Sequence, residues 1–172
     1  MTKAVRKKEV RVHIRWMSRR DMTEVLAVEA QSFEFPWLEE DFVRCLRQPN
    51  CIGMVAERDD RVVGFMIYEL DRSRIRVLDF AVGAGERRCG VGTQMVAKLK
   101  EKLSNLRRQR IVLKIRETNL PAQMFFSSRF VGFRAVQVLH GPYDGTLEDA
   151  YLMEFWHCPE EPEFFADICL PR

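Results

Sequence analysis

The sequence feature that most constrains the fold is a glycine-bearing loop between a strand and an amphipathic helix. The pattern of residues 75–82 predicts a strand, and the apolar residues of 91–103 recur on one face of a helix. Residues 83–92 connect the two with the sequence Gly-Ala-Gly-Glu-Arg-Arg-Cys-Gly-Val-Gly. The segment therefore predicts a strand, a loop and a helix within an α/β layout.

This loop has the properties of an anion site. The N-terminus of a helix offers unpaired N–H groups and the positive end of the helix dipole. Glycine at positions 90 and 92 lets the backbone approach a phosphate closely, and Arg87 and Arg88 add positive charge. We therefore predict that the loop binds a phosphate group.

Two other phosphate-binding motifs are excluded. In a dinucleotide-binding fingerprint, a third glycine would stand where Arg88 follows Gly83-x-Gly85. In a P-loop, lysine and then serine or threonine would follow Gly90, but the sequence has Val91-Gly92 there. The loop therefore belongs to a different class of phosphate site.

The rest of the chain predicts a mostly antiparallel sheet with one central crossover, an α/β fold of the α+β type. Apolar and polar residues alternate over residues 10–16, the pattern of a half-buried strand. Ser18, with Asp21 three residues later, predicts the start of a helix that ends before Phe35-Pro36. Further helices are predicted at 38–47 and 120–128, and further strands at 51–57, 61–70, 111–116, 134–139 and 148–156.

Composition indicates a single-domain protein. The 172 residues suffice for one domain with one core. No apolar run approaches the ~18 residues that span a bilayer, and no apolar region follows the basic start, so neither a membrane partner nor a secretory signal is expected. Scattered cysteines without zinc spacing predict reduced thiols, no metal and a cytoplasmic location. They are Cys45, Cys51, Cys89, Cys158 and Cys169.

Charge is distributed unevenly between the two ends. Residues 1–20 carry eight Lys or Arg side chains against Glu9 alone, whereas the tail at 157–172 is acidic. The basic arm at 1–9 can contact phosphates or an acidic partner, but a solvated and partly disordered terminus is the simpler interpretation. Aromatic residues do not interleave with these charges, which argues against nucleic acid as a partner. The domain itself is expected at 10–156.

With these elements in order, the chain resembles the GNAT superfamily of N-acetyltransferases. Residues 87–92 match its (Gln/Arg)-x-x-Gly-x-(Gly/Ala) signature, and Phe80-Ala81-Val82 stands where the family has an Ile-Ala-Val strand end. The order of the predicted elements is also that of the GNAT fold. The resemblance implies a mixed, mostly antiparallel sheet of six to seven strands with about four helices, splayed between strands four and five.

Three further segments carry the resemblance. The segment from Asn119 to Phe133 is similar to the GNAT Asn-x-x-Ala-x-x-Leu-Tyr…Gly-Phe segment. The segment from Glu29 to Trp37, with Phe35-Pro36 in it, resembles the early helix and loop of the ribosomal-protein-alanine N-acetyltransferases. Glu148–Met153 resembles the final strand of that group and of its eukaryotic N-terminal relatives.

The resemblance implies direct transfer of acetyl from acetyl-CoA to an amine. It implies that backbone groups around Val82 bind the pantetheine arm and polarise the thioester carbonyl, that residues 87–93 hold the pyrophosphate, and that Asn119 lies beside the CoA arm. The residues expected to bind the cofactor are Phe80, Ala81, Val82, Arg87, Arg88, Cys89, Gly90, Val91, Gly92, Thr93, Asn119 and Phe126.

The chemistry of that subgroup does not transfer directly. Its general base is a glutamate on the fifth strand and its general acid a tyrosine on the next helix, but the matching positions here are Lys114 and Phe126. The double tyrosine of its substrate loop is His140-Gly141 here. Cys89 suits pyrophosphate contact rather than attack on the thioester. Candidates for another base are Glu34, Glu117, His140 and Tyr143, whose alternative interpretations are exposed carboxylates for the two glutamates, a turn residue and rim packing.

The missing base favours an acceptor of low pKa. At pH 7 an α-amine is about one-tenth neutral, a penalty of ~1.4 kcal/mol, whereas a lysine ε-amine costs roughly 4–5 kcal/mol. We therefore expect a monomer or homodimer that acetylates a protein N-terminal α-amine. The alternatives are an acetyltransferase for polyamines or amino-sugars, and a non-catalytic acyl-CoA-binding module. The basic arm also leaves open an adaptor associated with a ribosome or RNA.

Overall fold

Seven strands form one mixed sheet in the order β1-β2-β3-β4-β5-β7-β6. The computed structural model describes residues 9–142 and 148–157. The strands are β1 His13–Trp16, β2 Cys51–Arg58, β3 Arg61–Leu70, β4 Arg74–Val82, β5 Arg110–Arg116, β6 Arg134–Leu139 and β7 Ala150–Trp156. The helices are α1 Met22–Ser32, α2 Glu39–Leu46, α3 Val91–Lys100 and α4 Leu120–Ser127, with short 3₁₀ helices η1 Arg19–Asp21 and η2 Ala84–Glu86. The predicted α/β class is confirmed.

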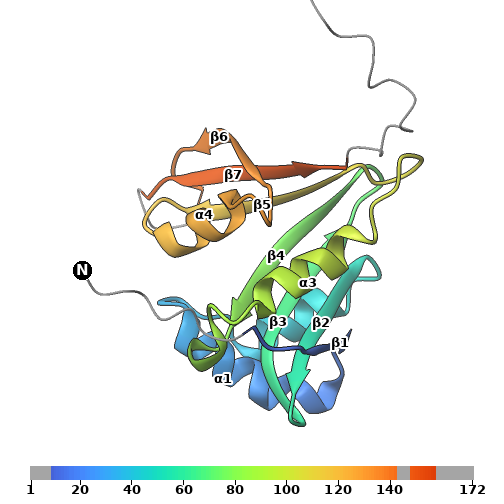
Figure 1. Cartoon of the computed structure of the whole chain (residues 1–172), viewed down its shortest axis with the longest axis vertical. Helices are drawn as coiled ribbons and strands as arrows, with labels where there is room; N and C mark the ends of the chain where they lie inside the picture. Colours follow the sequence, from blue (N-terminus) through green and yellow to red (C-terminus); the bar gives the residue numbers. More distant parts are fainter. Residues whose placement is uncertain (1–8, 143–147, 158–172) are drawn as a thin grey trace, which may run out of the picture.

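The sheet is split between β4 and β5 (Figure 1). These two strands run parallel and pair only through residues 74–76 and 110–112. The other neighbouring pairs among the described strands are antiparallel. Beyond residue 76 the strands diverge, so no strand covers the rest of the β4 edge that faces β5. The predicted splay between the fourth and fifth strands is therefore confirmed.

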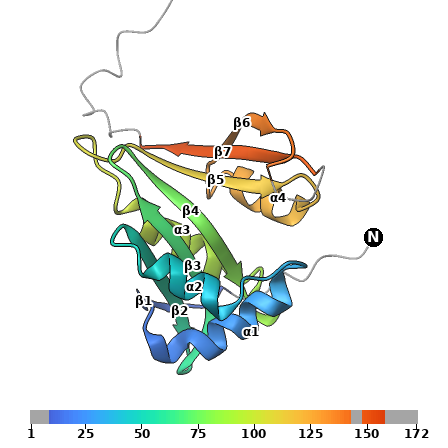
Figure 2. The same cartoon turned by 180° about the vertical axis from the view of Figure 1, so that it is seen from behind.

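Helices cover both faces of the first half of the sheet. In Figures 1 and 2, α1 and α2 lie on one face of β2–β4 and α3 lies on the other. Val25 of α1 and Phe42 of α2 pack with Phe65 of β3 in one buried cluster. Met95 and Leu99 of α3 belong to the cluster on the opposite face, as the helical spacing of 91–103 predicts.

A charged network fixes the start of α1. The Ser18 N–H donates to the Asp21 carboxylate at 2.7 Å, and the Arg15 guanidinium donates to both of its oxygens at 2.8 Å. Arg15 also donates to Glu57 of β2 at 2.6 Å. The hydrogen bonds from Arg15, with those from Ser18, hold the pKa of Asp21 well below its usual range. The helix predicted after Ser18 therefore begins as η1 and continues as α1.

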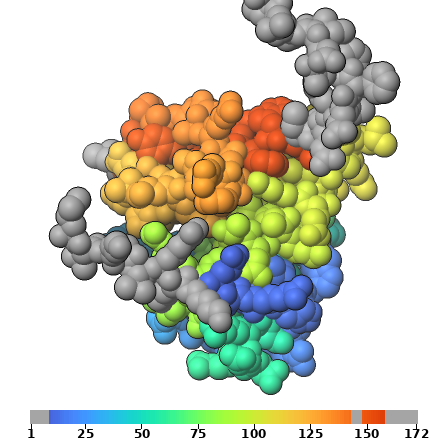
Figure 3. All heavy atoms as spheres, viewed as in Figure 1, coloured from blue at the N-terminus to red at the C-terminus, as the bar shows by residue number. Residues whose placement is uncertain are grey.

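Lys100 of α3 contacts the second half of the sheet beside their shared apolar core. Its Nζ donates to the Val131 carbonyl at 2.7 Å and lies 3.7 Å from the centroid of the Phe155 ring. Figure 3 shows the yellow-to-red half and the blue-to-green half in contact on one side, with a hollow between them on the other. The two halves are thus joined at one end and open at the other.

The sequence prediction that the cysteines are reduced thiols is wrong for two of them. Cys45 near the end of α2 and Cys51 at the start of β2 form a disulfide, with their Cα atoms 6.2 Å apart. The chain turns back between them because the Gln48 N–H donates to the Cys45 carbonyl and the Cys51 N–H donates to the Gln48 carbonyl. Cys89 is a buried free thiol. Cys158 and Cys169 lie outside the described residues, as do residues 1–8 of the basic arm and residues 158–172 of the acidic tail.

Candidate active site

The glycine loop turns sharply before α3. Arg88 and Gly90 have φ angles of +66° and +84°, in the left-handed region that favours glycine. Gly90 is the N-cap of α3, so the unpaired N–H groups of the first helical turn follow it directly. The first turn of α3 carries no acidic residue. The loop therefore has the backbone geometry and charge that an anion site requires.

Gly92 lies close to two aromatic side chains. A Cβ added there would lie 3.1 Å from the Phe125 ring and 3.4 Å from the Phe80 ring. These two rings come from α4 and β4, with centroids 6.1 Å apart. Gly92 was predicted to admit a phosphate, and the structure adds that it lets α3 approach the aromatic residues at the split.

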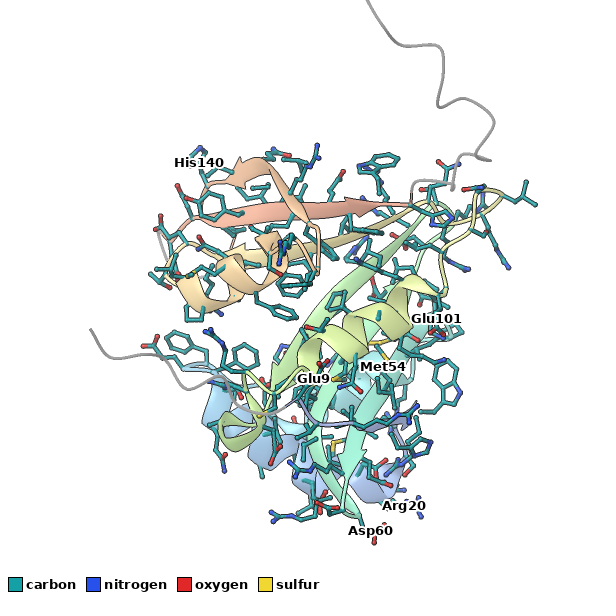
Figure 4. All side chains as sticks on the ribbon, in the orientation of Figure 1. Glu9, Arg20, Met54, Asp60, Glu101 and His140 are labelled. Atoms are coloured by element: carbon teal, nitrogen blue, oxygen red, sulfur yellow. A yellow bond between two sulfur atoms is a disulfide. The ribbon has the colours of Figure 1, made fainter. Side chains whose placement is uncertain are left out.

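The chain before β1 lies against this loop, which the sequence did not predict. The Val10 N–H donates to the Cys89 carbonyl at 3.0 Å, and Gln94 of α3 donates to the Val10 carbonyl at 2.7 Å. Figure 4 shows Glu9 beside the N-terminal end of α3. A Cβ added at Gly90 would lie 3.1 Å from a carboxylate oxygen of Glu9. An anion bound at Gly90 would therefore meet this carboxylate.

Arg87 points toward the sheet. Its Nε donates to the Val82 carbonyl at 2.8 Å and its Nη2 donates to the Ser32 hydroxyl at 3.0 Å. The guanidinium therefore ties the end of β4 to the end of α1. The sequence predicts that Arg87 binds the pyrophosphate. In the structure, its guanidinium instead donates to the Val82 carbonyl and the Ser32 hydroxyl.

The β4 edge at the split presents two backbone amides. The Gly83 N–H donates to the Val63 carbonyl across the β3–β4 pair at 2.9 Å. Residues of an antiparallel strand alternately face the partner strand and face away from it. In this register, the N–H groups of Val82 and Phe80 point away from β3 and into the split. These are the amides that the sequence predicts to contact pantetheine and the thioester.

Two predicted cofactor residues have structural roles. The Asn119 side chain caps α4 by accepting the Ala122 N–H at 3.2 Å. Phe126 is 5% exposed and packs edge-on against Phe133 and Phe80, with ring centroids 5.1 Å and 6.0 Å away. Phe126 is thus part of the core between α4, β4 and the start of β6.

Of the four candidate bases, the structure describes Glu34, Glu117 and His140. Glu117 and His140 both meet Asp149, whose N–H donates to Glu117 at 3.3 Å and whose carboxylate lies 2.9 Å from His140 Nδ1. The His140 side chain is 82% exposed, and Figure 4 shows it at the far end of the second half. Glu34 is exposed in the loop between α1 and α2, and Tyr143 lies outside the described residues. The exposed positions of Glu34 and His140 match their alternative interpretations.

A buried carboxyl pair was not predicted from the sequence. Glu29 of α1 is 1% exposed and Asp79 of β4 is 8% exposed, and their side chains hydrogen-bond to each other. Burial, with the charge of Glu29, raises the pKa of Asp79 to about 8, and burial also raises the pKa of Glu29. Two features of the sequence could have indicated this pair. Glu29 lies on the apolar face of a helix, and Asp79 lies inside an apolar strand.

Within residues 9–142 and 148–157, no group of three or more His, Cys, Asp or Glu side chains is arranged to hold a metal ion. In that same part of the chain, no helix has the length and apolar character needed to cross a membrane.

Relatives identified by sequence align with most of the length of this chain. The profile of the acetyltransferase (GNAT) family matches residues 14–133, well over half of the chain. An uncharacterised N-acetyltransferase of Methanocaldococcus jannaschii is 31% identical over 142 residues, which cover 81% of this chain and 88% of the relative. A putative ribosomal protein bS18-alanine N-acetyltransferase of Bacillus subtilis is 24% identical over 141 residues, covering 81% of this chain and 92% of the relative.

Solved structures share the fold. The ribosomal-protein-S18-alanine N-acetyltransferase of Escherichia coli superposes with a TM-score of 0.72 at 17% identity, covering 90% of this chain and 99% of that chain. NAA60 of Arabidopsis thaliana, solved in complex with acetyl-CoA, superposes with a TM-score of 0.71 at 18% identity, covering 85% of this chain and 99% of that chain.

Proposed function

This chain belongs to the acetyltransferase (GNAT) family, and we propose that it transfers acetyl from acetyl-CoA to the α-amine of a protein N-terminus. The observation that carries the proposal is the continuity of the β4 edge with the glycine loop. The amides of Phe80 and Val82, which point away from β3, and the N-terminus of α3 follow one another along the chain. A ligand with an amide-bearing arm and an anionic end fits this order of donors.

Acetyl-CoA has both parts. Its pantetheine arm would pair with the β4 edge, and its pyrophosphate would accept N–H groups of Gly90–Thr93, with Arg88 adding charge. The Phe80 or Val82 amide would then donate to the thioester oxygen as negative charge develops on it. The structural neighbour NAA60 was solved with acetyl-CoA, which supports this choice of cofactor.

Amine chemistry and the names of two relatives both favour an α-amine as the acceptor. The Bacillus subtilis relative and the Escherichia coli neighbour are both named for acetylation of an alanine of a ribosomal protein. Here β5 carries the exposed Lys114, a cation, at the position where a carboxylate base was expected. An α-amine is the protein amine that needs the least help with deprotonation at pH 7.

Acetyl-CoA turnover tests the proposal. We expect release of CoA with peptides that have a free N-terminus, including peptides that start with alanine. The same peptides with a blocked N-terminus and an internal lysine should give turnover no better than buffer. Turnover with polyamines or amino-sugars but with no peptide would contradict the α-amine assignment and select the small-amine alternative. CoA binding in calorimetry without any turnover would select the non-catalytic alternative.

A further inference from the structure

The buried pair Glu29–Asp79 is placed where a proton acceptor for this reaction is needed. Glu29 Oε1 accepts the N–H of Trp37 at 2.7 Å, which anchors this carboxyl to the loop between α1 and α2. Glu29 Oε2 and Asp79 Oδ2 are buried. Among the described residues, neither oxygen accepts a hydrogen bond from a donor outside the pair. Because the two carboxyl groups bond to each other, one of them must carry a proton. The pair therefore holds one proton and one negative charge.

Asp79 lies beside the open β4 edge. It immediately precedes Phe80 in β4, so its carboxyl is one residue from the Phe80 N–H. This N–H is one of the two amides that point into the split. The Asp79 carboxyl is therefore one residue along the strand from an amide that would face the thioester carbonyl.

The register of β4 aims this carboxyl toward α1. The pairing of β3 with β4 shifts at Ile67 and Tyr68, and Leu78 is the extra residue of the resulting bulge. Val77 before the bulge belongs to the α3 side of the core, whereas Ala81 after it belongs to the α1 side. The bulge thus turns Asp79 to the same face as Glu29.

The neighbours of the pair leave its charge unscreened. Ile67 lies opposite Asp79 in β3, and Phe42 of α2 packs on the same face. Glu29 is the one charged group among the described residues that acts on Asp79. A buried group of this kind prefers to be neutral, so it accepts a further proton more readily than an exposed carboxylate does.

We propose that the Glu29–Asp79 pair is the general base of the acetyl transfer, with Asp79 as the accepting carboxyl and Glu29 as a positioning residue. The proposal rests on the function proposed above. The acceptor enters as an ammonium and gives one proton to the pair, which becomes neutral. The amine nitrogen forms a bond to the carbonyl carbon, and the carbon–sulfur bond breaks. The second amine proton goes to the departing sulfur, so the products are the amide and CoA thiol. The pair then returns its proton to water.

The pH profile of Asp79→Asn tests the pair. At pH 7 we expect kcat/KM for an α-amine peptide to fall on the order of 10- to 100-fold. At pH 9.5 the amine is neutral without help, so the variant should come within about threefold of the unaltered protein. Glu29→Gln keeps a donor to Asp79 but removes the second carboxyl, so the acid limb of its profile should move to lower pH.

Two controls separate this role from a structural one. Glu40→Gln changes an exposed carboxylate on α2 and should leave the whole profile unchanged. CoA affinity from calorimetry should agree within about twofold among all four proteins, because none of the changes touches the glycine loop. A loss of activity in Asp79→Asn by the same factor at every pH would overturn the assignment, and so would full activity at every pH.

Failure of the proposed function gives a different result. If the unaltered protein acetylates only small amines, the protein N-terminus is the wrong acceptor, and the same pH profiles measured with those amines still test the pair. If the protein turns over no amine at any pH, both the proposed function and the role of the pair are wrong.

Discussion

Gly90 and Gly92 of the loop disfavour a side chain for different physical reasons. Single substitutions can tell these two reasons apart. Gly90→Ala forces a side chain into the left-handed region and against Glu9, which costs about 1–2 kcal/mol. Gly92→Ala overpacks the Phe125 ring, at a cost of about 1–3 kcal/mol. For a chain of this size, each kcal/mol lowers the thermal midpoint by about 2–4 °C. Both variants should also bind CoA more weakly in calorimetry, because the backbone must shift where the pyrophosphate would bind.

Gly85→Ala is the matched control, since a Cβ added there meets no atom within 4 Å. It should leave the thermal midpoint and the CoA affinity unchanged. Equal CoA affinity in all three variants would contradict the assignment of the pyrophosphate to this loop.

At the scale of elements, Lys100 is a polar contact between α3 and the second half of the sheet. Lys100→Met keeps the apolar stem but leaves the Val131 carbonyl without its donor and removes the cation above Phe155. We expect a loss of about 1–3 kcal/mol in the free energy of unfolding by urea. Lys98→Met removes an exposed ion pair with Glu101 from the same helix and should cost less than about 0.5 kcal/mol. Equal losses in the two variants would contradict the role given to Lys100.

The elements themselves were predictable because their signals are local. The strand predicted at 61–70 is β3 with the same bounds, and the helix predicted at 38–47 is α2 at Glu39–Leu46. The split in the sheet came from the family resemblance. The contacts of single residues could not be predicted, because they depend on how distant elements pack. The direction of Arg87 depends on where α1 ends, and the Glu29–Asp79 pair depends on α1 lying over the β4 bulge.

At the scale of the whole molecule, two buried acidic sites among the described residues have pKa shifts of opposite sign. The pKa of Asp21 is lowered by Arg15, so this carboxylate contributes stability above its unfolded pKa of 3.8, and the contribution is lost as pH falls through the lower folded value. The pKa of Asp79 is raised, so its contribution is fully present below 3.8 and is lost as pH rises through its folded value of about 8. The folded protein should therefore lose stability at both ends of the pH range.

Two substitutions should each remove one limb of this pH dependence. In the unaltered protein, the native state binds one extra proton between about pH 4 and pH 8. The free energy of unfolding therefore falls by up to about 1.4 kcal/mol for each pH unit of rise. In Asp79→Asn this fall should be absent. The variant should therefore gain on the unaltered protein as pH rises. In Asp21→Asn the acid limb should flatten, while the alkaline limb remains. Urea titrations at pH 3, 5, 7 and 9 measure both limbs. An alkaline limb that persists in Asp79→Asn would show that the pair does not hold an extra proton in the native state, and the general base would then have to be sought among the exposed groups.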